Sequence, residues 1–161
     1  MNAPTPSRAR RFACMLYEGV LLFGVVFLAN TLFDTLTQSR HGLALRHARQ
    51  AWLFLVIGLY FVLCWRQQGQ TLPMQTWKIR LLTRSGSVPG TTTLVLRYLL
   101  LWPLPLATAG LIALMARLSG WPALDLLIAV APFSLFVYTW TDRDGQFLHD
   151  HLLGTRLLGP P

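Results

Sequence analysis

Four long apolar stretches, separated by polar connections, set the pattern of this chain. The first follows two arginines and covers residues 12–33, with one carboxylate, Glu18, inside it. The others cover about 50–66, 94–116 and 121–140. About twenty apolar residues, at a rise of roughly 1.5 Å each, cross a hydrocarbon core of about 30 Å. The pattern therefore predicts an all-α membrane protein with four transmembrane helices.

The second and third stretches predict departures from a straight, full-length span. The uninterrupted apolar run 51–65 is short for a bilayer, so we expect local thinning or snorkelling side chains at its flanks. Trp52 and Trp65, at its two ends, are expected to act as interfacial anchors. Pro103 and Pro105 each leave a carbonyl one turn back without its donor, which predicts a kink.

The polar loop 67–93 and the tail 141–161 predict a small non-helical element. Within the loop, Trp77, Ile79 and Leu81 recur at every second position, which indicates a short strand over about 77–82. The tail segment 154–158 is the candidate partner. We therefore expect a short two-stranded ribbon on one membrane face, within a single membrane domain that covers residues 1–161.

Composition and charge agree with a membrane class. The chain of 161 residues is 53% hydrophobic and 12% charged, and its mean hydropathy of +0.46 is high for a soluble domain. The formal net charge of +8 comes from basic residues dispersed between the apolar runs. This distribution is typical of helix flanks that orient a protein in the bilayer rather than of a nucleic-acid site. We expect the lipid bilayer as partner and no nucleic acid.

The basic residues also predict the orientation. With a cytoplasmic N-terminus, ten of the 14 basic residues lie on that side: Arg8, Arg10, Arg11, Arg66, Lys78, Arg80, Arg84, Arg97, Arg143 and Arg156. The other side keeps four: Arg40, Arg46, Arg49 and Arg117. Cytoplasmic loops are enriched in Lys and Arg, so we expect four spans with both ends in the cytoplasm, in the inner membrane of a bacterium.

Two alternative interpretations of the chain have weaker support. A cleaved signal peptide usually has an apolar region of about 7 to 15 residues, and the first apolar stretch is longer, so we expect it to be retained. Cys14 and Cys64 lie inside apolar stretches without a CxxC pattern or a neighbouring His, so we expect them to be small core residues. We expect no metal and no cofactor.

Charged residues within the first and third stretches predict a buried cluster. Arg11 and Glu18 are seven residues apart, which places both on one helix face with Glu18 about 10 Å deeper. A carboxylate that faced lipid would be costly, so we expect Glu18 to face protein and to pair with Arg97 or Arg11. Two roles remain open: the pair fixes helix packing, or Glu18 helps to move ions or protons.

Five polar side chains of the tail could in principle gather a cation: Asp142, Asp144, His149, Asp150 and His151. The DxDG motif lacks the rest of a calcium loop, and the two histidines diverge by about 200° on a helix. We therefore favour a short interfacial helix that begins at Asp144 and ends at Gly154. Asp150 is then expected to meet a basic residue such as Arg11.

These residues together resemble the RDD family of small multi-pass membrane proteins. Arg11 stands at the start of the first helix, Glu18 occupies the place of the family's first aspartate, and Asp150 follows His149 as the later one. Other positions also resemble that family: the sequence GQTL at 69–72, Arg97, and Asp142 with Gln146. Two departures are Glu18 itself and the pair Pro73 and Met74, which stands where the family often has Gly and Lys.

The resemblance implies fold and membrane location more than chemistry. One hypothesis is transport of an unknown ligand or cation and proton exchange through Glu18, which implies a homo-oligomer because four short spans leave little room for a pore. The alternative is a non-catalytic adaptor that helps other membrane proteins to assemble. We expect no enzyme, because no nucleophile or metal motif is present. The candidate functional cluster is Arg11, Glu18, Arg97, Asp142, His149 and Asp150.

Overall fold

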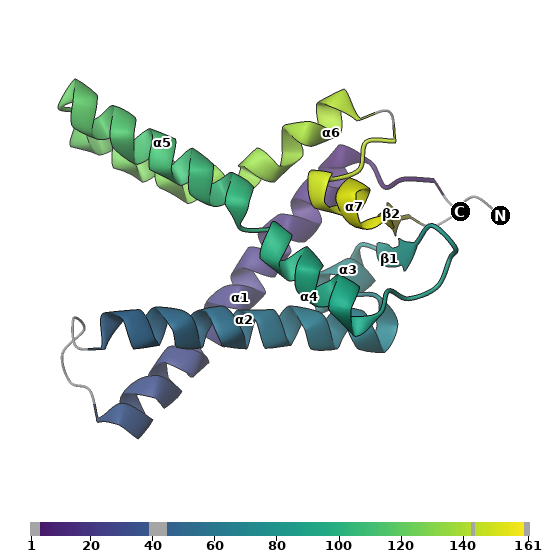
Figure 1. The fold of residues 1–161 in the computed structure, drawn as a ribbon, viewed down its shortest axis with the longest axis horizontal. Helices are drawn as coiled ribbons and strands as arrows, with labels where there is room; N and C mark the ends of the chain where they lie inside the picture. Colours follow the sequence, from purple (N-terminus) through teal and green to yellow (C-terminus); the bar gives the residue numbers. More distant parts are fainter. Residues whose placement is uncertain (1–3, 39–44, 143, 160–161) are drawn as a thin grey trace.

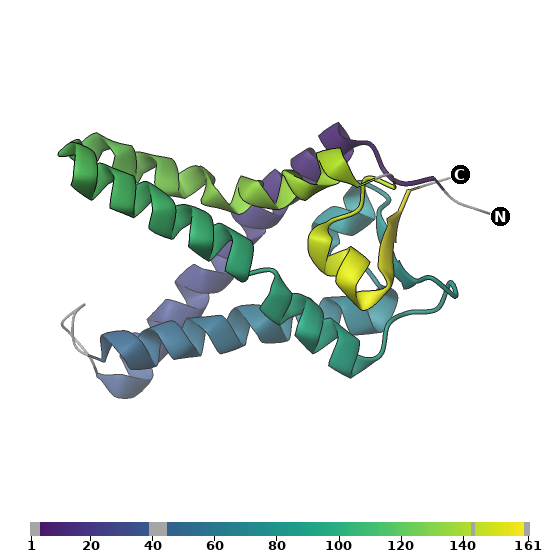
Figure 2. The same cartoon turned by 45° about the horizontal axis from the view of Figure 1, so that its top comes forward.

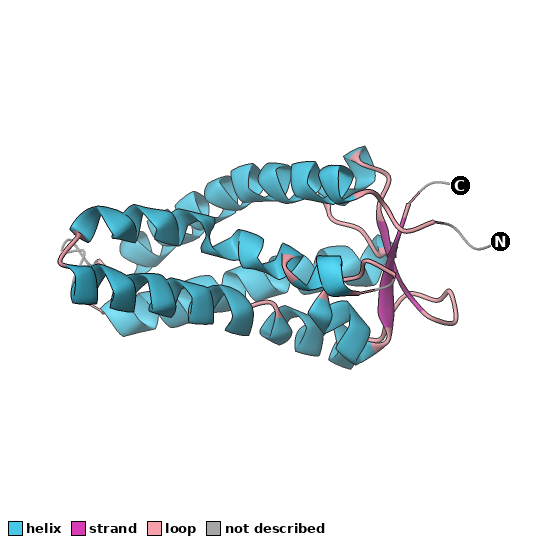
Figure 3. Cartoon of the chain, turned by 90° about the horizontal axis from the view of Figure 1, so that it is seen from above, coloured by secondary structure: helices cyan, strands magenta, loops and turns pink. Residues whose placement is uncertain are grey.

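The computed structural model of the protein describes residues 4–38, 45–142 and 144–159. Within these residues, four helical stretches are long and apolar enough to cross a membrane: Arg8–Thr37, Arg46–Thr76, Thr91–Ser119 and Pro122–Thr141. In Figures 1 and 3 the helices extend to one side of a small region that contains the short sheet and both chain termini. We call this region the terminal end. The four predicted spans are confirmed.

The first hairpin consists of α1 (Arg8–Thr37) and α2 (Arg46–Gln68). Ser7 caps α1 by accepting a hydrogen bond from the backbone amide of Arg10. The helix α2 continues through polar residues at both ends and has 23 residues, about 34 Å of rise. The helix is thus longer than the apolar run 51–65, and the expected snorkelling or local thinning at its flanks stays a prediction. Arg40 and Arg143, which entered the charge count, lie outside the described residues.

The two tryptophans of α2 do not both lie at an interface. Trp52 donates a hydrogen bond from Nε1 to the backbone oxygen of Ala29 on α1, at 2.9 Å. Trp65 is only 2% exposed and lies in the core of the terminal end, so its predicted role as an interfacial anchor is wrong.

The second hairpin is broken where the sequence predicts a kink. The helix α4 (Thr91–Leu100) ends before the two prolines, and α5 (Pro103–Ser119) begins at the first of them. After the turn at Gly120, η1 (Pro122–Phe136) returns as a 3-10 helix and packs along α5, followed by α6 (Tyr138–Thr141). The kink at the prolines is confirmed.

Short elements from the loop and the tail close the terminal end. Among the described residues, β1 (Arg80–Thr83) and β2 (Thr155–Leu158) form a two-stranded antiparallel sheet, with Leu81 opposite Leu157. The predicted ribbon is confirmed, although β1 starts later than expected because Lys78 occupies a left-handed turn with φ of 53°. The helix α3 (Leu72–Thr76), capped by the Thr71 side chain, precedes β1 and was not predicted.

The tail helix α7 (Leu148–Leu153) is shorter than the helix predicted from Asp144. The Asp142 carboxylate accepts a hydrogen bond from the backbone amide of Gln146, at 2.7 Å, so residues before α7 form a turn instead. The helix ends at Gly154, as predicted, because this glycine adopts a left-handed conformation with φ of 65°.

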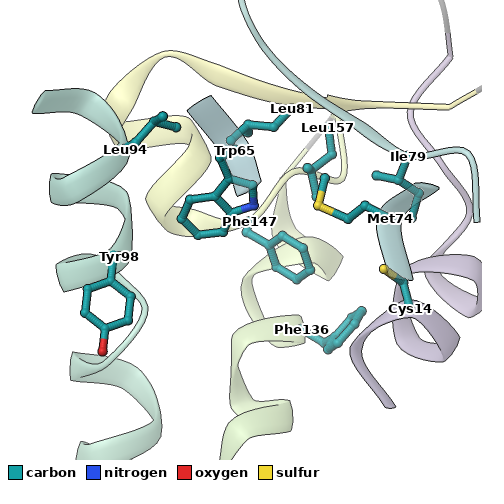
Figure 4. Packing of buried hydrophobic residues seen from close by; sticks show 10 residues of the cluster. All are labelled: Cys14, Trp65, Met74, Ile79, Leu81, Leu94, Tyr98, Phe136, Phe147 and Leu157. Carbon is teal, nitrogen blue, oxygen red and sulfur yellow. The ribbon is translucent and has the colours of Figure 1, made fainter. Parts of the chain in front are cut away.

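The hydrophobic core lies at the terminal end, where residues from α1, α2, α3, α4, η1 and the two strands meet (Figure 4). Leu81 and Leu94 are fully buried, whereas apolar side chains elsewhere on the helices, such as Phe23 and Leu118, are exposed as lipid-facing groups would be. The described residues nearest the two termini are hydrogen-bonded to each other here, since the backbone amide of Gly159 donates to the backbone oxygen of Pro4. Both ends therefore lie at the same end of the bundle, and their cytoplasmic location stays a prediction.

Tyr98 joins α4 to α2, and its hydroxyl gives a test of this packing. The hydroxyl donates to the backbone oxygen of Phe54 at 2.6 Å, and the ring covers Gly58, where a Cβ would lie 2.7 Å from it. Tyr98→Phe keeps the ring and removes one hydrogen bond, so we expect a loss of about 1 kcal/mol in the free energy of unfolding in micelles. Tyr17→Phe, at a 40% exposed position, is the control; equal stability of the two variants would contradict this prediction.

Candidate functional site

A buried ion pair joins α4 to α7 at the centre of the terminal end. Arg97 donates from Nε to Oδ1 of Asp150 at 2.8 Å and from Nη2 to Oδ2 at 3.2 Å. The Thr155 hydroxyl donates to the same Oδ1 at 2.8 Å, and the guanidinium lies 4.3 Å from the centre of the Trp65 ring. Asp150 is 0% exposed and Arg97 is 5% exposed. The pair is therefore bidentate, further hydrogen-bonded and shielded from water, which is the geometry that a buried ion pair requires.

His149 lies beside this pair but is not charged with it. Its Nε2 is 3.6 Å from Oδ2 of Asp150, and burial, reinforced by Arg97, lowers the pKa of His149 to about 4, although the Asp150 charge opposes this. Burial alone would raise the pKa of Asp150, but Arg97, His149 and the hydrogen bond from Thr155 together hold it below its ordinary value. At neutral pH the cluster thus holds one cation, one anion and a neutral imidazole.

The N-terminal arginines of α1 hold the start of the tail. Arg11 is 4% exposed, donates from Nη1 to the backbone oxygen of Gly145 and lies 5.0 Å from the centre of the Phe147 ring. Arg8 donates to the backbone oxygen of Thr139 at 2.9 Å. Asp150 meets a basic residue, as predicted, but this residue is Arg97 and not Arg11.

Glu18 faces protein, as predicted, but its partners are hydroxyl groups. Tyr60 of α2 donates to Oε1 at 2.7 Å, and Thr71, just before α3, donates to Oε2. Over residues 4–38, 45–142 and 144–159, no basic side chain lies within ion-pair distance of this carboxylate. The predicted ion pair between Glu18 and Arg97 or Arg11 is therefore wrong, since each arginine is directed toward the tail.

Asp142 and His151 lie outside this cluster. Besides capping the turn at Gln146, Asp142 has one oxygen 3.6 Å from Nδ1 of His151, whose side chain is 52% exposed. His149 points inward and His151 outward, so the predicted divergence of the two histidines is confirmed. In the part of the chain that the structure describes, no group of three His, Cys, Asp or Glu side chains is placed to hold a metal ion.

A cavity of about 480 Å³ brings the separate charged residues together. It lies between α1, α2 and α4 on one side and the α5 and η1 hairpin on the other, two groups of helices that Figure 2 shows converging on the terminal end. Four of the six predicted site residues line it: Arg11, Glu18, Arg97 and His149. Asp150 lies behind Arg97 and His149, and Asp142 does not border the cavity.

Sequence reasoning missed the uncharged residues that complete the site. Tyr60 and Thr71 hold Glu18, and Thr155 completes the shell of Asp150. Thr71 lies in the GQTL motif, so this position carried a signal through the family resemblance. Tyr60 carried none, because an aromatic residue inside an apolar run looks like any other core residue.

The sequence model described as the RDD family matches residues 5–154, which include every residue of the site except Thr155. No curated protein and no solved structure matches the chain. With this match over most of its length and four apolar helices, the chain belongs to the RDD family of multi-pass membrane proteins.

Proposed function

We propose that this protein is a membrane transport component in which Glu18 takes up and releases a proton or a small cation. One observation carries the proposal: Glu18 lines the cavity from within a membrane-spanning helix, and its described partners are two hydroxyl groups. Hydroxyl donors can follow a change in the charge of a carboxylate by rotating, whereas a guanidinium would hold it charged. Ionisable groups inside membrane helices commonly mark ion or proton pathways.

The neighbouring ion pair is less suited to this role. Asp150 is held by both nitrogens of a bidentate Arg97 contact and by Thr155, so a cation or proton would have to displace several hydrogen bonds. We therefore assign Arg97 and Asp150 to positioning α7 against α4, and the exchange step to Glu18.

The cavity is shallower than the hydrocarbon core of a bilayer. Its lining on α1 extends from Arg11 to Leu22, about 17 Å of rise and near half of a hydrocarbon core of about 30 Å. This cavity therefore does not cross the bilayer in this conformation. We propose that transport needs a second conformation or a homo-oligomer, in a bacterial inner membrane with the terminal end in the cytoplasm.

Flux in proteoliposomes tests the proposal. With an imposed Na⁺ or K⁺ gradient and a pH-sensitive dye inside the vesicles, the wild-type protein is expected to move protons, and Glu18→Gln is expected to abolish this flux. Asp125→Asn removes an exposed carboxylate of η1 and is the matched control, expected to keep the wild-type rate. Wild-type flux in Glu18→Gln, with both variants monodisperse, would exclude Glu18 as the exchanging group.

A second candidate function is the adaptor, and one surface favours it. Arg80 and Arg156 are exposed, and the register of β1 and β2 places both on the outer face of the sheet. We propose this face as the contact for an acidic surface of another membrane protein. Co-purification of a tagged chain from membranes is expected to retain a partner that Arg80→Glu with Arg156→Glu releases. In this case the purified wild-type protein shows no flux.

A further inference from the structure

The cavity is large and apolar, apart from one polar end. Its volume of about 480 Å³ is within the range of roughly 300–1,000 Å³ typical of small-molecule sites. The wall away from the terminal end is formed by aromatic and aliphatic side chains that include Phe61, Leu101 and Phe133, and by Trp102, whose buried Nε1 also lacks a hydrogen-bond partner among the described residues. The polar side chains gather at the terminal end, where Arg11, Glu18, Thr71, Arg97 and His149 contribute to the lining. A ligand that fills this space needs an apolar body and a small polar head.

Three buried nitrogens at the polar end lack hydrogen-bond partners among the described residues: Nε of Arg11, Nε1 of Trp65 and Nε2 of His149. These residues are 4%, 2% and 3% exposed, and all three line the cavity. Figure 4 shows the indole nitrogen of Trp65 turned into the interior, toward Phe147 and Met74. The nitrogens of Arg11 and Trp65 can only donate, and a buried donor without an acceptor is costly. The polar head should therefore carry an acceptor oxygen.

The charges around the cavity balance, which favours a head without net charge. Arg97 is neutralised by Asp150, and His149 is neutral at pH 7. Arg11 and Glu18 then remain, with opposite signs, so the lining has no net charge that would favour an anionic or a cationic head.

We propose that this cavity is a binding site for a neutral amphiphile, with its ester or ketone oxygen at Trp65 and Arg11 and its hydrocarbon body between α1, α4 and η1. The bordering helices expose apolar side chains on their outer surfaces, so the bilayer is the proposed source of such a ligand. This site is independent of ion exchange at Glu18, and its test uses binding rather than flux.

The first experiment compares heads on one hydrocarbon chain. The full-length protein in maltoside micelles is labelled with three diazirine-bearing C16 probes that end in a methyl ester, a sulfonate or a trimethylammonium group. We expect the ester to label cavity peptides, including the one with Phe133, saturably and at least tenfold more than either charged probe. Equal labelling by all three probes, or preference for a charged one, would overturn the proposal.

Two pairs of variants locate the site. Trp65→Phe keeps the ring beneath Arg97 and removes the free donor, so the ester is expected to bind about fivefold to tenfold more weakly; Trp121→Phe, at a 70% exposed position, leaves binding unchanged. Gly19 borders the cavity and Gly24 does not, and a Cβ at either meets nothing within 4 Å. Gly19→Leu is therefore expected to block labelling, and Gly24→Leu is not. Equal labelling within either pair would contradict this location.

Discussion

Replacement of Asp150 by Asn is expected to lower the free energy of unfolding by about 3–5 kcal/mol, the usual cost of leaving one partner of a buried ion pair without its counter-charge. The side chains of Asp150 and Arg97 are 0% and 6% exposed, so the guanidinium that remains cannot reach water. Asn keeps the shape and the acceptor for Thr155, so the loss reports the charge rather than a cavity. The measurement is unfolding by SDS titration in maltoside micelles, followed by far-UV circular dichroism.

A double variant and a surface control separate this effect from a general loss of folding. Arg97→Met combined with Asp150→Leu removes both charges and fills the space, so it is expected to recover most of the loss. Asp144→Asn breaks an exposed contact with Arg156, whose atoms are 3.7 Å apart, and is expected to cost less than about 1 kcal/mol. A loss in Asp150→Asn no greater than in Asp144→Asn would show that the buried pair does not stabilise α7 against α4.

The same pair shows why the fold was more predictable than the site. Span length and apolar runs are local properties of a sequence, so four spans, the break at Pro103 and the partner strands could be predicted from residue patterns alone. The apolar run of the second span does not give the helix ends, because hydropathy detects apolar residues only. The helix α2 continues through Arg66 to Gln68 and is stopped only at Gly69, whose φ is 66°.

The ion pairing of the site depends on the path of the tail, which no local pattern predicts. A buried carboxylate is costly without a counter-charge, so the sequence suggested that Glu18 and a nearby arginine would form an ion pair. The tail instead folds back onto the terminal end of the bundle, where the Gln146 side chain accepts a hydrogen bond from the backbone amide of Leu157. This path places Asp150, and not Glu18, as the ion-pair partner of Arg97. Glu18 is then left to hydroxyl donors from α2 and the start of α3. Residue types were sufficient to predict a polar cluster, and tertiary packing decided its partners.

His149 makes this cluster sensitive to acid. Burial lowers its pKa in the folded protein to about 4, from an ordinary value near 6.5 in the unfolded chain. Below pH 6.5 the unfolded chain therefore binds a proton that the folded chain resists, and the free energy of unfolding falls as the pH falls. The fall continues until the folded histidine also titrates, near pH 4, and amounts to roughly 3 kcal/mol. The pKa of Asp150 is held below its ordinary value, so its own contribution is lost at lower pH still.

His149→Phe is expected to remove this part of the pH dependence. The imidazole stacks on Phe147 with ring centres 5.4 Å apart and planes 10° from parallel, so a phenyl ring can take its place without a charge to acquire. His151→Phe, at a side chain that is 52% exposed, is the matched control and should keep the wild-type slope. Thermal unfolding in micelles at steps from pH 7 to pH 4 measures all three proteins. Parallel curves for wild type and His149→Phe would mean that His149 takes up its proton without opposing the fold, and the acid sensitivity would then have to originate elsewhere in the bundle.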